Sequence, residues 1–75
     1  MSIREAVYEY LAKYARNKID INDDTKIKDE LGIDSFLALS ILMDLQKEDI
    51  GFKEGKIPPL VTVNDLLNSL EKKNG

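Results

Sequence analysis

The sequence has no cysteine and no histidine among its 75 residues. Disulfide bonds, thiolate metal sites and cysteine nucleophiles are therefore excluded, and the side chain that most often acts as a general acid or base is missing. The sequence also shows no pair of carboxylates that would share a pocket. We therefore expect a protein that is not an enzyme.

The chain also lacks an excess of positive charge and any long apolar run. Eleven Lys and Arg against fourteen Asp and Glu give a net charge of −3, so the clustered cations that nucleic-acid binding needs are missing. No apolar run reaches the length of a membrane span, and charges interrupt the N-terminal stretch where a signal peptide would be apolar. We expect a cytoplasmic protein without nucleic-acid partner or membrane span, forming one domain over residues 1–75.

Apolar residues recur at helical spacing in three stretches of the chain. The first covers residues 3–15 and the second covers residues 35–48. The third begins at residues 62–65, TVND, where Thr62 and Asp65 match the capping box that opens many helices.

Two connecting segments separate these helices. Residues 17–34 form a long loop, and we expect four apolar residues to hold it on the core: Ile19, Ile21, Ile27 and Leu31. Residues 49–61 contain Pro58 and Pro59, which allow at most a short turn of helix. No segment alternates like a strand, and residues 71–75 should fray. The predicted fold is all-α, a small four-helix bundle with three main helices and one short helix.

One acidic segment is a poor match to a calcium-binding loop. Asp20, Asn22 and Asp24 alternate as in such a loop. The sixth position of the loop requires Gly and the twelfth requires a bidentate Glu, but here they hold Thr25 and Leu31. We therefore reject a calcium-sensor loop and predict no metal site.

The second predicted helix has apolar residues on two faces. One group, expected to face the core, consists of Ala38, Ile41, Leu42 and Leu45. The group nearly opposite consists of Phe36, Leu39 and Met43, with Leu37 between the two groups. Because a surface helix needs only one apolar stripe, part of the second group should be free to contact another protein. We expect Phe36 to be partly covered, and Leu39 and Met43 to face outward.

Ser35 lies at the start of this second helix, and its role is open at this point. Serine is a good N-cap, but position 38, where a capping box would place Glu or Gln, is Ala. Asp34 is an equally good cap, and it would leave the Ser35 hydroxyl free. A phosphate ester on that hydroxyl would be favoured by the amides and the dipole of the helix N-terminus.

Residues 29–36, DELGIDSF, resemble the attachment motif of acyl carrier proteins, and the resemblance extends over nearly the whole chain. It implies that Ser35 carries a 4′-phosphopantetheine arm through a phosphodiester that a phosphopantetheinyl transferase forms. The thiol of the arm would hold an acyl group as a thioester, which suits a chain without cysteine. By the same resemblance, Asp34 helps the transferase to hold its magnesium.

The resemblance also implies cargo and partners. Acyl-transferring, ligating or condensing enzymes would act on the carried group in fatty-acid-like, polyketide or specialised lipid biosynthesis, and a monomer is expected of a diffusing shuttle. The acyl chain would enter a cavity between the second helix and residues 49–61. The expected lining residues are Leu42, Ile50, Phe52, Ile57 and Leu60.

The second helix departs from the acidic pattern of general fatty-acid carriers. Between residues 36 and 48 only Asp44 and Glu48 are negative. We therefore expect weak electrostatic steering and a mainly apolar docking face, formed by Leu37, Leu39, Ser40 and Met43. This composition favours a specialised pathway with its own enzymes.

Two other functions are compatible with the sequence. The chain could carry an aminoacyl or peptidyl group, although GIDSF is closer to the acyl type. It could instead be a small helical interaction module with no attached group, in which Ser35 is a plain cap and the second apolar stripe is a docking groove. Loading by a transferase would separate a carrier from such a module.

Overall fold

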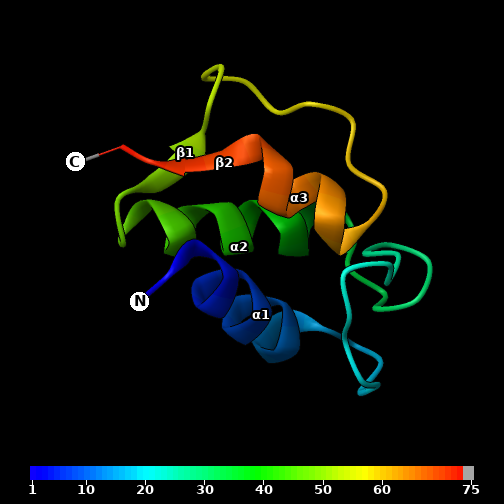
Figure 1. Ribbon diagram of the computed structural model, residues 1–75. Coiled ribbons are helices and arrows are strands. Elements are labelled where there is room, and N and C mark those ends of the chain that lie inside the picture. Colours follow the sequence, from blue (N-terminus) through cyan, green and yellow to red (C-terminus); the bar gives the residue numbers. More distant parts are fainter. Residues whose placement is uncertain (74–75) are drawn as a thin grey trace.

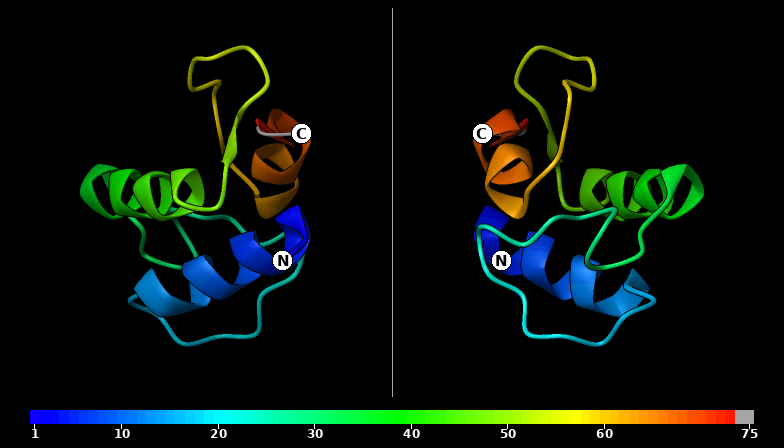
Figure 2. Two further views of the ribbon diagram at one scale, coloured as in Figure 1. Left: turned by 90° about the vertical axis from the view of Figure 1, so that its left-hand side faces the viewer. Right: turned by 90° about the vertical axis from the view of Figure 1, so that its right-hand side faces the viewer.

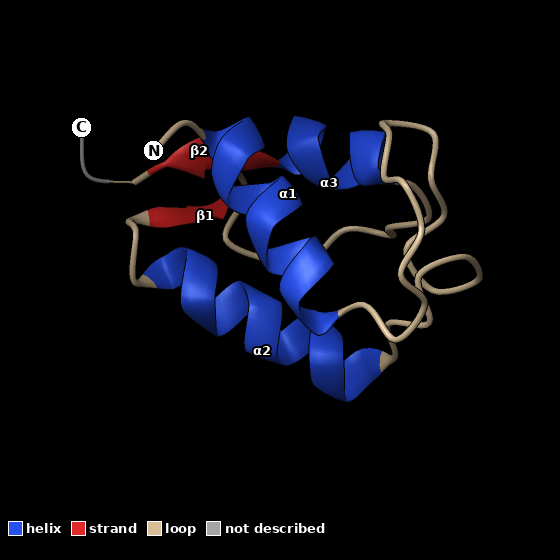
Figure 3. Cartoon of the chain, turned by 90° about the horizontal axis from the view of Figure 1, so that it is seen from below, coloured by secondary structure: helices blue, strands red, loops and turns tan. Residues whose placement is uncertain are grey.

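A computed structural model describes residues 1–73 of the chain. Within this range lie three helices, α1 (Ile3–Tyr14), α2 (Ser35–Gln46) and α3 (Val63–Ser69), and two short strands, β1 (Ile50–Phe52) and β2 (Leu70–Lys72) (Figure 1). Seen from below, α1 lies across the molecule between α2 on one side and α3 with the strands on the other (Figure 3). None of the three helices is long and apolar enough to span a bilayer.

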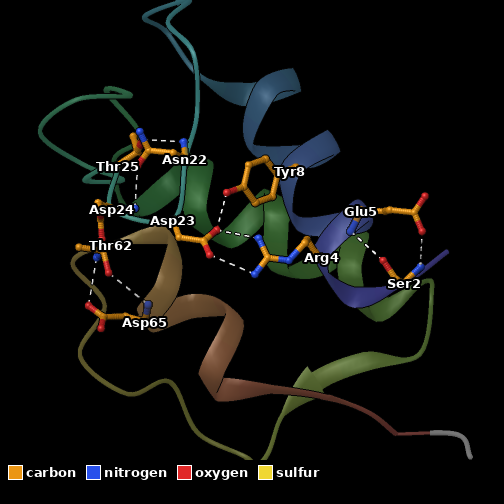
Figure 4. A network of polar contacts seen from close by, with 10 residues as sticks. All are labelled: Ser2, Arg4, Glu5, Tyr8, Asn22, Asp23, Asp24, Thr25, Thr62 and Asp65. Carbon is orange, nitrogen blue, oxygen red and sulfur yellow. Dashed lines mark hydrogen bonds and ion pairs between the residues drawn. The ribbon is translucent and has the colours of Figure 1, made fainter.

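Side-chain caps explain where α1 and α3 begin. Ser2 and Glu5 form a reciprocal capping box at the start of α1. Thr62 and Asp65 form a second box at the start of α3, which confirms the box predicted from the sequence (Figure 4). Each box satisfies two amide groups that the first turn of a helix leaves without a partner.

The three helices bury one face each in a common core, to which the long loop also contributes. The largest fully buried side chains are Leu11, Leu31, Leu45, Ile50, Val7 and Val63. In the loop, Ile27 and Leu31 are buried and Ile21 is half-buried, as expected. The expectation for Ile19 was wrong. It is exposed, because the chain has turned away from the core after α1.

Polar contacts fasten the long loop to α1 (Figure 4). Asp23 accepts hydrogen bonds from the Tyr8 hydroxyl and from Arg4, whose Nη1 lies 2.8 Å from Asp23 Oδ1. Within the loop, the Asn22 side chain accepts the backbone N–H of Asp24 at 2.8 Å, an Asx turn. No group of three or more acids within residues 1–73 could hold a metal ion. The alternating polar residues therefore form turns and anchors.

The segment after α2 differs from the prediction of a short fourth helix and no strand. β1 pairs with β2 in antiparallel register, with Ile50 opposite Lys72 and Phe52 opposite Leu70. Strands of three residues are too short to show an alternating pattern, so hydrophobic periodicity could not indicate them. Residues 53–61 contain no helix and form a loop that projects beyond the helices (Figure 2).

The C-terminal residues also differ from expectation. Residues 71 and 72, which were expected to fray, are held in β2 by their pairing with β1. The backbone N–H of Lys73 donates to the carbonyl of Asp49 and extends the contact by one residue. Asn74 and Gly75 of the same predicted segment lie outside the described residues.

Ionised side chains predict the pH dependence of stability. Five carboxyl groups have pKa values below their usual range, in each case mainly because a hydrogen bond is donated to the charged form: Glu5, Asp23, Asp34, Asp44 and Asp65. A pKa that folding lowers contributes stability above the unfolded value, and this stability is lost as the pH falls through the folded value. The thermal midpoint should therefore fall below about pH 4.

The tyrosines determine how stability depends on pH in the alkaline range. Hydrogen bonds to carboxylates raise the pKa values of Tyr8 and Tyr14, and the bond to Glu48 raises that of Tyr10 to about 12. Stability from a raised pKa is complete below the unfolded value, so the midpoint should fall above about pH 10. With no His or Cys side chain, the profile should be flat from about pH 5 to 9.

Circular dichroism melting curves from pH 2 to 12 measure this profile. Asp44→Asn should make the acid limb shallower, because Asp44 is one of the five hydrogen-bonded carboxylates. Asp29→Asn is the control variant, since the Asp29 carboxylate accepts no hydrogen bond from any residue between 1 and 73. Equal acid limbs for both variants would contradict the assignment.

Candidate functional site

The start of α2 is organised by Asp34, which resolves the choice of cap that the sequence left open. Asp34 is the N-cap, and its Oδ1 accepts the backbone N–H of Leu37 at 3.0 Å. Its Oδ2 accepts a hydrogen bond from Arg16 Nη2 at 2.9 Å. The Leu37 bond and then the charge of Arg16 lower the pKa of Asp34, so that the group is a carboxylate at neutral pH.

Ser35 is the first residue of α2 and its side chain is exposed. Because Asp34 provides the cap, the Ser35 hydroxyl makes no hydrogen bond within the described part of the chain. It lies at the N-terminal end of a twelve-residue helix, where free amides and the helix dipole favour a negatively charged group. The hydroxyl is therefore accessible to an enzyme and placed where a phosphate ester is stabilised.

The outer face of α2 is apolar. Phe36 is 83% exposed and Met43 is 57% exposed, and Leu39 between them is also exposed. The expectation that Phe36 would be partly covered was wrong, because its side chain lies on the face of α2 that does not pack against the core. Two other predicted docking residues are less accessible. Leu37 packs half-buried against the core, and the half-buried Ser40 donates its hydroxyl to the Phe36 carbonyl.

Two adjoining pockets lie between α2 and residues 53–61. One has a volume of about 360 Å³ and begins at Asp34 and Ser35. The other has a volume of about 550 Å³ and reaches β1. The two pockets share three apolar lining residues, Leu39, Leu42 and Ile57.

The structure distributes the predicted cavity residues over these two pockets. Leu42 and Ile57 line both, and Leu60 lines only the pocket that begins at Ser35. Ile50 and Phe52 line only the second pocket. Sequence reasoning missed the aliphatic residues that form the floor of the first pocket: Leu11, Ile27, Ile33 and Leu66. They belong to three different segments, so no local pattern could place them together.

The acids of the second helix region face α1 and are already bound. The Tyr14 hydroxyl donates to Asp44 Oδ2 at 2.7 Å, and Lys13 lies 3.5 Å from the same oxygen. The hydrogen bond from Tyr14 and then the charge of Lys13 lower the pKa of Asp44. Glu48 accepts the hydroxyl of Tyr10. These two carboxylates therefore stabilise the contact between α1 and α2.

Comparison with known proteins identifies the family. A family model described as "Phosphopantetheine attachment site" matches residues 5–70. The chain is 34% identical over 74 residues to an acyl carrier protein of an Exiguobacterium species, covering 97% of this chain and 90% of that protein. It is 32% identical over 72 residues to the acyl carrier protein of Exiguobacterium sibiricum, covering 95% and 87% of the two chains.

An acyl carrier protein of Chlorobium phaeobacteroides is 30% identical over 73 residues, covering 95% of this chain and 94% of that protein. No solved structure matches at a comparable level of significance. The matched region includes the loop, all of α2 and all of α3. The chain therefore belongs to the acyl carrier protein family, whose cofactor is a covalently attached 4′-phosphopantetheine.

Proposed function

We propose that Ser35 carries the 4′-phosphopantetheine arm and that residues 1–75 act as one non-catalytic carrier domain for acyl thioesters. The observation that supports this most directly is the exposed hydroxyl of Ser35, which Asp34 leaves free by capping α2. Attachment forms a bond from Ser35 Oγ to phosphorus, breaks the bond from phosphorus to the donor's leaving group, and passes the hydroxyl proton to the transferase. When bound, the arm supplies the thiol that a chain without cysteine lacks.

We assign to Asp34 a part in holding the magnesium ion of the transferase. Its carboxylate is ionised, partly exposed, and directly precedes Ser35. Each carboxylate oxygen has two lone pairs, so the bonds to Leu37 and Arg16 leave capacity for a further ligand. Asp34 would thus shape the helix start and present a negative charge beside the reacting oxygen.

The pocket beside Ser35 favours an acyl cargo over an aminoacyl cargo. Its lining is mainly aliphatic and includes Leu42, Ile57 and Leu60. Burying the ammonium of an aminoacyl group in such a pocket would cost several kcal/mol, since no acid beyond Asp34 lines it. An aliphatic chain gains free energy from the same burial. We therefore propose that both pockets shelter acyl chains in the cytoplasm.

The partners that follow are a phosphopantetheinyl transferase and acyl-transferring, ligating or condensing enzymes of a specialised lipid or polyketide pathway. Leu39 and Met43 provide the exposed part of the proposed docking face. Leu37 and Ser40 lie at its edge and hold its shape. Two observations support this docking face. Its central side chains are apolar and exposed, and the carboxylate of Asp44 is turned toward α1, where Tyr14 binds it.

Co-expression with a phosphopantetheinyl transferase, followed by intact mass measurement, tests the attachment. The wild type should gain the mass of one phosphopantetheinyl group, and Ser35→Ala should gain none. Ser40→Ala is the matched control on the same helix and should load fully. Because Asp34 is the cap, Ser35→Ala should keep the wild-type melting temperature. Loading of Ser35→Ala, or no loading of the wild type by a transferase that loads the Exiguobacterium protein, would refute the assignment.

A further inference from the structure

The two pockets follow one another along α2 and meet at a shared boundary. The first pocket runs beside α2 from Ser35 to Leu42, and the second runs from Leu39 to Gln46 and on to β1. Leu39, Leu42 and Ile57 line both pockets and mark the place where they meet. We call the two pockets together the channel. An arm attached at Ser35 starts at the rim of the first pocket, so cargo that folds back meets this pocket first.

The far end of the channel can bury the end of an apolar chain. Its inner wall includes Ile50 and Leu70, which are 1% and 3% exposed, and the half-buried Phe52. The polar side chains that line this pocket are all exposed and therefore lie at its rim: Gln46, Asp49, Lys56 and Lys73. An acyl chain that reaches the inner wall removes its last methylene groups from water, which favours binding.

The length of the channel matches a long acyl chain. Because α2 rises 1.5 Å per residue, the first pocket extends about 10 Å from Ser35, and the channel extends about 16 Å from Ser35 to Gln46. Three bonds of extended backbone cover about 3.3–3.6 Å, so an extended hexadecanoyl chain reaches about 17 Å and a butanoyl chain about 3 Å. The short chain ends within the first pocket, whereas the long chain passes Ile57 and fills both.

The outer wall of the channel is a segment that can move at little cost. Residues 56–60 neither donate nor accept a hydrogen bond within the described part of the chain. Both ends of this segment are fixed by backbone hydrogen bonds of 2.9 Å, at Lys53 and at Val61. Between these ends, Ile57 and Leu60 provide the apolar contacts with the channel, and Ile57 is still 61% exposed. The segment can therefore approach a bound chain without breaking a hydrogen bond.

We propose that the channel holds long acyl chains, of about twelve to sixteen carbons, and that residues 56–60 close over them through Ile57. This inference rests on the proposed carrier function and specifies its cargo. Ile57 is then a specificity-determining residue, since it contacts the part of a chain that passes from the first pocket into the second.

Melting temperatures of the full chain test the inference, with a butanoyl, a hexadecanoyl or no acyl group on the arm. The hexadecanoyl form should melt at least about 8 °C above the unacylated form, because only the folded state buries the chain. The butanoyl form should melt less than about 3 °C above it. Ile57→Ser should lose about half of the hexadecanoyl gain and keep the butanoyl gain. Val61→Ser, a control at a similarly exposed residue that lines neither pocket, should keep both gains.

Amide shifts in ¹⁵N NMR spectra locate the two chains. Relative to the unacylated form, butanoyl should shift residues that line only the first pocket, such as Ile33 and Ala38. Hexadecanoyl should shift these and also Met43 and Phe52, which line only the second pocket. Each form should give the same shifts at all protein concentrations, because one copy holds its own cargo.

A second mode of attachment separates the channel from the carrier chemistry. Because the chain has no Cys, Ser35→Cys provides one thiol, whose thiolate displaces methanesulfinate from an alkyl methanethiosulfonate and forms a mixed disulfide. Butyl and hexadecyl groups attached in this way need no transferase and should reproduce both the order of melting temperatures and the two shift patterns. If the wild type gained no arm by mass while hexadecyl filled both pockets, the carrier function would fail and the channel would stand.

Four outcomes would overturn the channel while leaving the loading of Ser35 intact. They are equal gains in melting temperature from the two chain lengths, hexadecanoyl shifts confined to the first pocket, butanoyl shifts confined to the second pocket, and equal losses for Ile57→Ser and Val61→Ser. Hexadecanoyl shifts that depend on protein concentration would place the chain between two copies and would overturn it as well.

Discussion

Replacing Leu45 with alanine should lower the free energy of unfolding by about 2–5 kcal/mol. Leu45 is 1% exposed and lies in the core that α2 forms with α1 and α3. The truncation removes buried methyl groups and leaves a cavity, because the helices cannot close the gap completely. A domain of this size has only about 5–10 kcal/mol of stability in total, so the variant should be close to unfolding at 37 °C.

Met43→Ala is the matched control on the same helix. Met43 precedes Leu45 by two residues but is 57% exposed, so its truncation should change the free energy of unfolding by less than about 0.5 kcal/mol. Urea unfolding followed by circular dichroism measures both changes from the midpoint and the slope. Similar losses for the two variants would mean that α2 is not oriented as described.

The helices of this fold were predictable because their signals are local. The capping box of Thr62 and Asp65 lies within four residues, and the apolar stripe of each helix repeats within one turn. The strands were not predictable, since each has three residues and pairs with residues 18 to 22 positions away in the chain. The hydrogen bonds from Tyr8, Tyr10 and Tyr14 to distant carboxylates also have no local pattern.

The candidate site also combines features that were predictable from the sequence with features that were not. Asp34 and Ser35 are adjacent, so the sequence could name both, but it could not decide which one caps α2. Lys28 and Lys56 lie on opposite sides of α2 in the sequence, and only the folded chain brings both to the pockets. The exposure of Phe36 was missed because helical periodicity shows which residues share a face but not whether a second apolar face is covered by another segment.

Replacing Gly32 with alanine should cost about 2–3 kcal/mol of stability and slow the loading of Ser35. Gly32 has φ 71°, a left-handed conformation that costs other residues about 1–2 kcal/mol. A Cβ atom there would lie 3.2 Å from Arg16 Cβ, so the side chain of Arg16 must shift. Because Arg16 holds Asp34 at 2.9 Å, the disturbance reaches the residue next to Ser35.

Gly55→Ala isolates the crowding from the backbone conformation. Gly55 has nearly the same φ, 72°, but an added Cβ atom would meet nothing within 4 Å. This variant should therefore lose only the conformational cost of about 1–2 kcal/mol and should load at the wild-type rate. Urea unfolding and a time course of intact mass with the transferase measure the two effects. If the two glycine variants lost equal stability, the crowding at Arg16 would make no contribution to the free energy of unfolding. If only stability differed and loading did not, Arg16 would not position Asp34 for the transferase.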